Sequence, residues 1–118
     1  MAKDKIHNAF HTDIDRVTQY KVTVKNILEN LAKRVPNNRP TLTNHLIIND
    51  IQSEFILILN GWHNNKHYYN VVAHVEVTDS KILIHEESID PTIYERLIDQ
   101  NIPESDIIPV YLEKMELA

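Results

Sequence analysis

The chain has 118 residues, of which 42% are hydrophobic and 25% charged, as in folded globular domains and unlike disordered chains. It contains no cysteine, which excludes disulfides, thiolate zinc sites and cysteine nucleophiles. Its formal net charge of −5 argues against binding nucleic acid through the overall field. No signal peptide is recognisable and no run approaches the roughly 18 apolar residues of a membrane span, so we expect a cytoplasmic protein without membrane contacts.

The charges are unevenly distributed along the chain. Residues 1–40 hold eight basic and four acidic side chains, a balance of +4, whereas residues 41–118 hold four basic and thirteen acidic ones, a balance of −9. Such basic side chains either keep a helix face in water or attract DNA or an acidic protein. The candidate basic strip consists of Arg16, Lys21, Lys25, Lys33 and Arg34.

A long helix is predicted near the start of the chain. From Asp13 onward, apolar residues recur at alternating spacings of three and four, at Val17, Tyr20, Val24, Ile27 and Leu31. The pattern predicts an amphipathic helix of about six turns that packs on a sheet and ends near Pro36. Residues 1–12 show no clear period and form an extension, so residues 13–118 are expected to be one domain.

The pattern changes to that of β-strands after Pro40. Segments 46–49, 54–62, 67–77 and 81–86 are rich in Ile, Val and aromatic residues and are separated by short polar connectors. Connectors this short cannot hold a crossover helix, so the four segments are expected to pair antiparallel as a meander.

Alternation along the strands assigns their faces. The second segment has apolar side chains on both sides, and its second face carries Ile56, Ile58 and Trp62. In the third segment, His74 shares a face with Tyr68, Asn70, Val72 and Glu76, and the opposite face carries Tyr69, Val71, Ala73, Val75 and Val77. A strand that is apolar on both sides cannot leave one of them fully in water, so something must cover the second face.

The C-terminal part predicts one more helix and one more strand. Asp90-Pro91 is typical of a helix start, and the apolar residues that follow predict a short helix, ending near Gln100, that could lie over the second face. Residues 107–111 could add an edge strand limited by Pro109. The expected fold class is α+β, with a long N-terminal helix on an antiparallel meander of about four to five strands and a short helix near the C-terminus.

Gly61 is the only glycine and directly precedes Trp62, the only tryptophan. A single glycine marks a position where φ is positive or where a side chain would collide. Either Asn60-Gly61 forms a hairpin turn, or the strand continues through Gly61 as a bulge and turns at Asn64-Asn65. We favour the second structure, because Trp62-His63 is too short for a strand between two turns.

Several short motifs follow one another in order. They are Tyr20 in the first helix, Gly61-Trp62, the strand with His74, Lys81-Ile82-Leu83-Ile84 and Ile102-Pro103-Glu104-Ser105-Asp106-Ile107. This order and approximate spacing, over roughly residues 17–111, resemble the XisI family of cyanobacterial excision controlling factors. The resemblance implies an α+β fold and a non-catalytic accessory role, with an XisH-like companion protein, in controlling the recombinase that excises a DNA element, the fdxN element, during heterocyst development. It implies no catalytic residue and no cofactor.

The chain departs from that family at three places. Leu83 stands where the family carries a tryptophan, Asn101 where it carries a glycine before Ile-Pro, and residues 109–114 where it carries a His-Pro-Pro segment. A partner contact made by that last segment is therefore expected to differ.

The histidines and the lone glycine bear on catalysis and metal binding. His63, His67, His74 and His85 fit surface positions on a sheet better than a metal site, since no carboxylate or thiol is fixed at ligand spacing beside them. His74 and His85 on neighbouring strands could also form a pH-sensitive pair. A single glycine cannot build a Walker loop, dinucleotide fingerprint or nucleophile elbow, so we expect neither an enzyme nor a metal or other cofactor.

The second face of the sheet is the expected contact with a partner protein. The partner is a second copy of this chain, an XisH-like companion or both, and DNA is reached only indirectly through a recombinase. The candidate contact residues are Ile56, Ile58, Trp62, Tyr68, His74 and Leu83. The alternative is a DNA-binding regulatory protein that uses the basic strip of the N-terminal helix.

Overall fold

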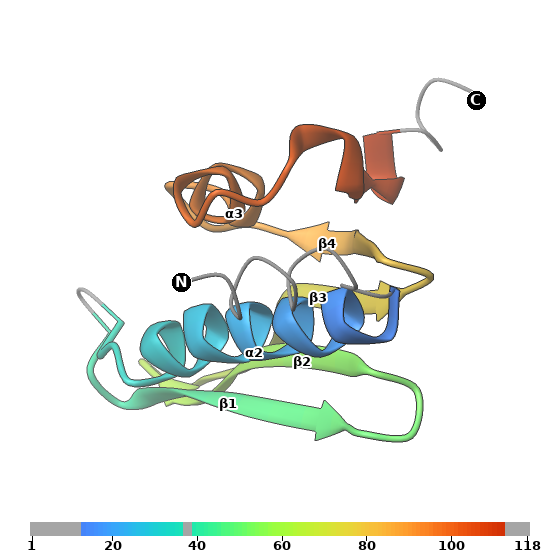
Figure 1. Cartoon of the computed structure of the whole chain (residues 1–118). Coiled ribbons are helices and arrows are strands. Elements are labelled where there is room, and N and C mark those ends of the chain that lie inside the picture. The colour runs from blue at the N-terminus through green and yellow to red at the C-terminus, as the bar shows by residue number, and fades with distance from the viewer. Residues whose placement is uncertain (1–12, 37–38, 113–118) are drawn as a thin grey trace.

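The computed structural model describes residues 13–36 and 39–112, which form an α+β fold in which the helices α2 and α3 pack on a five-stranded sheet (Figure 1). The elements in chain order are α2 (Asp13–Ala32), β1 (Leu42–Asn49), β2 (Glu54–His63), β3 (Lys66–Thr78), β4 (Lys81–Glu87), α3 (Ile93–Asp99), the 3-10 turn η1 (Glu104–Asp106) and β5 (Ile107–Pro109). The predicted fold class is confirmed. The predicted extension of residues 1–12 lies outside the described residues.

The sheet has the strand order β1-β2-β3-β4-β5. The first four strands form the predicted antiparallel meander, whereas β5 pairs parallel with β4 and ends at Pro109. The turns at Asn64-Asn65 and Asp79-Ser80 have positive φ at both residues, from 49° to 64°. This is the geometry of two-residue hairpin turns, whose twist matches that of the flanking strands.

Gly61 lies inside β2, which continues through it to the predicted turn at Asn64-Asn65. Its φ is 142°, and a Cβ at this position would lie 2.9 Å from the carbonyl oxygen of Thr41. Glycine is therefore required here both by the positive φ and by the collision that a side chain would make. Gly61 pairs in regular register with Leu42 and Tyr68, so the predicted bulge at Gly61 is wrong.

A bulge occurs instead in β3. Along β2, the partners in β3 step from Ala73 directly to Val71, which leaves Val72 as an extra residue. An extra residue shifts the alternation by one, so the part of β3 before Val72 exchanges faces relative to the part after it. Tyr69 and Val71 therefore share a face with His74, which corrects the predicted faces of this strand.

Both helices pack on the same face of the sheet. α2 lies along β1, β2 and β3, and α3 lies beside β4 (Figure 1). Both contribute to one core, whose buried members are Tyr20, Val24, Leu28, Leu31, Phe55, Leu57, Ala73, Val75, Val77, Ile82, Ile84, Ile93, Leu97, Ile102 and Ile107. The short helix therefore does not cover the second face, and its N-cap is Thr92 rather than Asp90. Neither described helix is long and apolar enough to cross a membrane.

Candidate protein-contact face

The open face is the side of the sheet turned away from α2 and α3. Residues that pair directly across strands share a face, so the register defines its members. Its apolar side chains are Ile47 from β1, Ile56, Ile58 and Trp62 from β2, Tyr69 and Val71 from β3, Leu83 from β4 and Ile108 from β5. Among the described residues, both helices lie on the opposite side.

Four large apolar side chains of the open face are exposed. The exposed fractions are 48% for Ile47, 63% for Trp62, 62% for Tyr69 and 45% for Val71. Ile58, at 6%, is buried between its neighbours. A group of exposed aliphatic and aromatic side chains on one surface is typical of a protein-contact site.

Five of the six predicted contact residues lie on this face, namely Ile56, Ile58, Trp62, His74 and Leu83. Tyr68 does not, because the bulge at Val72 moves it to the opposite face, where it pairs with Gly61. There the Arg39 guanidinium lies 5.2 Å and the Lys66 ammonium 5.1 Å from the centre of its ring. The contact role of the other five stays a prediction.

Three exposed members of the face were not among the predicted contacts. Ile47 pairs with Ile56, so continuing the alternation of β2 into the strand before it would have placed Ile47 on this face. Tyr69 and Val71 reach the face only because of the bulge, and no residue type in β3 indicates that bulge in advance.

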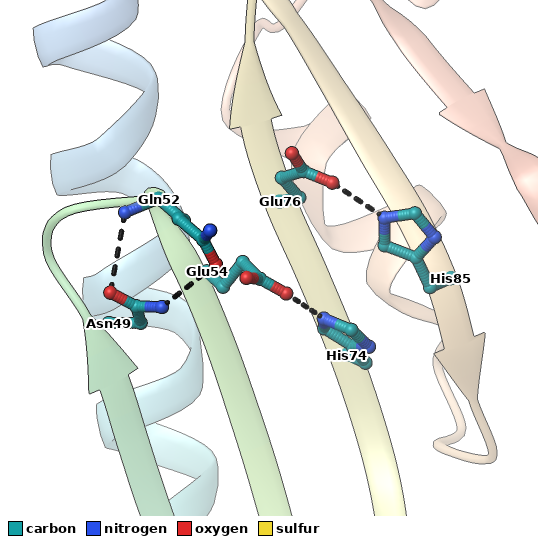
Figure 2. A network of polar contacts seen from close by, with 6 residues as sticks. All are labelled: Asn49, Gln52, Glu54, His74, Glu76 and His85. Carbon is teal, nitrogen blue, oxygen red and sulfur yellow. Dashed lines mark hydrogen bonds and ion pairs between the residues drawn. The ribbon is translucent and has the colours of Figure 1, made fainter.

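Two histidine–glutamate pairs lie on the open face (Figure 2). His74 Nε2 is 2.8 Å from Oε2 of Glu54, and His85 Nε2 is 2.9 Å from Oε1 of Glu76. The two imidazole rings are 4.7 Å apart between centroids and tilted by 38°. His74 and His85, which were predicted to be neighbours, are thus in contact. Each imidazole also pairs with a glutamate carboxylate from the adjacent strand.

A second bulge brings His85 to this position. Along β3, the partners in β4 step from Glu86 to Ile84, which leaves His85 as the extra residue. Among the described residues, no three His, Asp or Glu side chains converge as ligands for a metal ion.

The predicted basic strip is divided in the structure. Lys33 and Arg34 lie beyond Ala32, where α2 ends, so they do not stand in its last turn. At the helical rotation of about 100° per residue, Lys21 and Lys25 flank one side of the buried stripe and Arg16 flanks the other. The five side chains therefore do not form one continuous surface on the helix.

Among the described residues, the most buried charged side chain lies on the helix side of the sheet. Asp106, 7% exposed, accepts hydrogen bonds from the hydroxyl of Tyr20 and from Nζ of Lys81, the latter at 3.0 Å. Burial raises the pKa of Asp106, but these hydrogen bonds and the charge of Lys81 outweigh it, so the pKa lies below its usual value. Burial and the hydrogen bond to Asp106 raise the pKa of Tyr20 to about 12.

This cluster connects three elements that are distant in the sequence. The hydroxyl of Tyr20 comes from α2, the carboxylate from η1 and the ammonium from the start of β4. Lys81 also donates to the carbonyl oxygen of Ser105, at 3.2 Å. We refer to Tyr20, Asp106 and Lys81 as the buried tie.

Comparison with known proteins agrees with this architecture. The model of the XisI protein family matches residues 14–116. A crystal structure of a XisI-like protein from Anabaena variabilis ATCC 29413 is 24% identical, with 79% of this chain and 84% of that one covered and a TM-score of 0.70. The crystal structure of the fdxN element excision controlling factor XisI from the same organism is also 24% identical, with 82% and 87% covered and a TM-score of 0.67. No curated protein matches. Because the family model spans most of its length, the chain belongs to the XisI family.

Proposed function

We propose that this protein is a non-catalytic accessory factor in the control of DNA-element excision, and that it acts in the cytoplasm through protein–protein contacts made by the open face. Membership of the XisI family supports the first part, as does the name of one similar structure, an fdxN element excision controlling factor. The observation that carries the second part is that Trp62, Tyr69 and Val71 are exposed on a face that both helices leave uncovered.

Trp62 is the expected centre of the contact. Its ring stacks on that of His67, with centroids 4.9 Å apart and a tilt of 37°, so it is held in position before any partner binds. A side chain that is already positioned loses little conformational entropy on binding. Tryptophan and tyrosine are also the residue types that most often dominate binding energy at protein interfaces.

The partner that we propose is an XisH-like companion protein. The chemistry of excision then belongs to a separate recombinase, which is the only component that has to act on DNA. This division of roles is consistent with the overall negative charge of the chain and with the divided basic side chains of α2.

Titration calorimetry of the full chain against its XisH-like companion tests the proposal. Trp62→Ala is expected to weaken binding by about 2 kcal/mol or more, about thirtyfold, because it removes the central aromatic ring. Tyr68→Ala is the matched control, since it removes an aromatic ring from the same hairpin but on the opposite face. Equal losses for the two variants would contradict docking through the open face, and a wild-type chain that does not bind the companion would contradict the choice of partner.

A further inference from the structure

The two edges of the sheet are built very differently. β5, at one edge, has three residues and ends at Pro109, which has no backbone N–H to offer. β1, at the other edge, has eight residues in unbroken register with β2. In the part of the chain that the structure describes, no strand pairs with the outer side of β1.

β1 lacks the features that usually protect an edge strand. Its sequence, LTNHLIIN, contains no lysine, arginine, aspartate, glutamate or proline, and its pairing with β2 contains no bulge. Natural edge strands are commonly protected by lysine, proline, bulges or short length. Alternate residues of an edge strand direct their N–H and C=O groups outward. β1 therefore offers a regular row of backbone donors and acceptors to another strand.

Three polar side chains of β1 already have hydrogen-bond partners within the chain. Asn44 points to the helix side, where its amide donates to the carbonyl oxygens of Leu31, at 3.5 Å, and Arg34, at 3.2 Å. This holds the end of α2 over the sheet. On the open face, the hydroxyl of Thr43 lies 2.9 Å from Nε2 of His45, so these two polar groups satisfy each other along the strand.

We propose that β1 pairs antiparallel with β1 of a second copy of this chain, so that one continuous sheet runs through a twofold dimer. The occupant is a second copy because β1 carries no Lys, Arg, Asp or Glu: a strand of this composition meets its own copy without repulsion between such charges, whereas an edge selective for a charged partner strand would carry complementary charges. A twofold axis normal to the sheet makes this contact self-complementary and closed.

The face pattern restricts the register of the dimer. Residues that pair across the two copies must lie on the same face of the sheet, so they are an even number of positions apart in the sequence. The twofold axis therefore passes through one residue of β1 and not between two neighbouring residues. The two registers with the greatest overlap centre on His45 or Leu46, and Ile47 of each copy then lies opposite Thr43 or His45 of the other. Both open faces end on the same side of the joined sheet. This inference is independent of the proposed function.

Sedimentation of the full chain over a concentration series tests the dimer. The wild type is expected to be dimeric, and Ile47→Lys, which places a charge in the edge strand, should raise the dissociation constant at least about tenfold. Val71→Lys is the matched control, because Val71 is similarly exposed on the same face but lies in the inner strand β3. A monomeric wild type would overturn the proposal, and so would a dimer that Val71→Lys weakens as strongly as Ile47→Lys, since the interface would then be the open face.

Cross-linking gives a second readout that does not depend on how well Ile47→Lys folds. The chain has no cysteine, so His45→Cys introduces a unique thiol at the centre of the proposed interface. A short bis-maleimide should join two copies through this position but not through Asp79→Cys, which lies in the turn between β3 and β4. Failure of the His45→Cys protein to cross-link, or equal cross-linking at both positions, would refute pairing through β1.

Discussion

Gly61 is a residue that tolerates little change. A side chain at this position would collide with the carbonyl oxygen of Thr41. The residue would also have to keep a backbone φ of 142°, which residues other than glycine rarely adopt. Gly61→Ala is expected to lower the free energy of unfolding by about 2–3 kcal/mol, because backbone strain of this kind costs about 1–3 kcal/mol before the collision is counted. Urea denaturation measures the change.

Asn70→Ala is a suitable control for that substitution. Asn70 is an exposed residue of β3 on the same side of the sheet, two residues from the cross-strand partner of Gly61. Its truncation should change stability by no more than about 0.5 kcal/mol. A Gly61→Ala protein as stable as Asn70→Ala would mean that β2 adapts to a side chain at this point.

Asn101 shows how a departure from the family pattern is accommodated. Its φ is 64°, and it follows the C-cap of α3, a position that glycine usually fills and asparagine fills next most often. The backbone N–H of Asn101 donates to the carbonyl oxygen of Ile98, and the backbone N–H of Ile102 donates to the carbonyl oxygen of Leu97. These are the two hydrogen bonds of a Schellman motif. Asn101 thus adopts the backbone conformation for which glycine is the usual residue.

At the scale of elements, the buried tie joins segments that are distant in sequence. One carboxylate holds the hydroxyl of Tyr20 in α2 and the ammonium of Lys81 at the start of β4. A buried carboxylate is stable only when it is paired and hydrogen-bonded. Removal of either Tyr20 or Lys81 would therefore leave the Asp106 carboxylate short of a partner, at a cost in stability. The tie therefore fixes where α2 and the C-terminal segment lie on the sheet.

Asp106→Asn tests the tie at acid pH. The pKa of Asp106 is lowered in the fold, so the ionised carboxylate stabilises the protein above the unfolded pKa, about 3.9, and this stabilisation is lost as the pH falls through the folded-state pKa. Asp106→Asn should cost about 1–3 kcal/mol at neutral pH and should lose less further stability than the wild type between about pH 5 and pH 2. Chemical denaturation at several pH values measures this, and Asp99→Asn, an exposed change in α3, should follow the wild type.

Tyr20→Phe tests the same tie at alkaline pH. Because the pKa of Tyr20 rises from 10.0 to about 12 in the fold, the protonated hydroxyl contributes stability that is complete below pH 10 and lost as the pH rises through about 12. The wild type should therefore lose the contribution of this hydroxyl as the pH rises from 10 to about 12. Tyr20→Phe lacks that contribution already at neutral pH, so its stability should change less over the same range. Thermal unfolding from about pH 9 to pH 12 measures the difference, and Tyr69→Phe on the open face should behave as the wild type does. Parallel curves for wild type and Tyr20→Phe would show that the hydroxyl contributes nothing.

Most helices and strands were predictable from a period of their own, although β1 begins at Leu42, before the predicted segment 46–49, and β5 ends at Pro109, within the predicted segment 107–111. The stripe from Val17 to Leu31 indicates α2, and the turn residues Asn64-Asn65 indicate the hairpin that follows Trp62. The bulges were not predictable, because they depend on which residue of the neighbouring strand is paired. This is why Tyr68 was assigned to the wrong face: its alternation is regular, but the strand gains a residue at Val72.

At the scale of the whole molecule, the two helices α2 and α3 cover the same side of the sheet. The sequence of β2 indicated that two faces need to be shielded, and in the described residues both helices lie on the same one. Composition alone could not show this, since the apolar residues of α3 fit either side. The open face and the β1 edge are adjacent, so a dimer through β1 would present two open faces side by side to a partner.

The buried tie also has a consequence for the order in which the protein assembles during synthesis. Tyr20 and Asp106 are 86 positions apart, so the first described helix has been made long before the group that fastens it exists. Until residues 102–109 emerge, α2 can rest on the early strands but lacks its anchor, and long-range closure of this kind is slow. In a nascent or prematurely terminated chain that lacks residues 102–109, α2 would therefore be weakly packed on the sheet. Proteases would cleave such a chain more readily, although the missing residues lie near the C-terminus and α2 lies near the N-terminus.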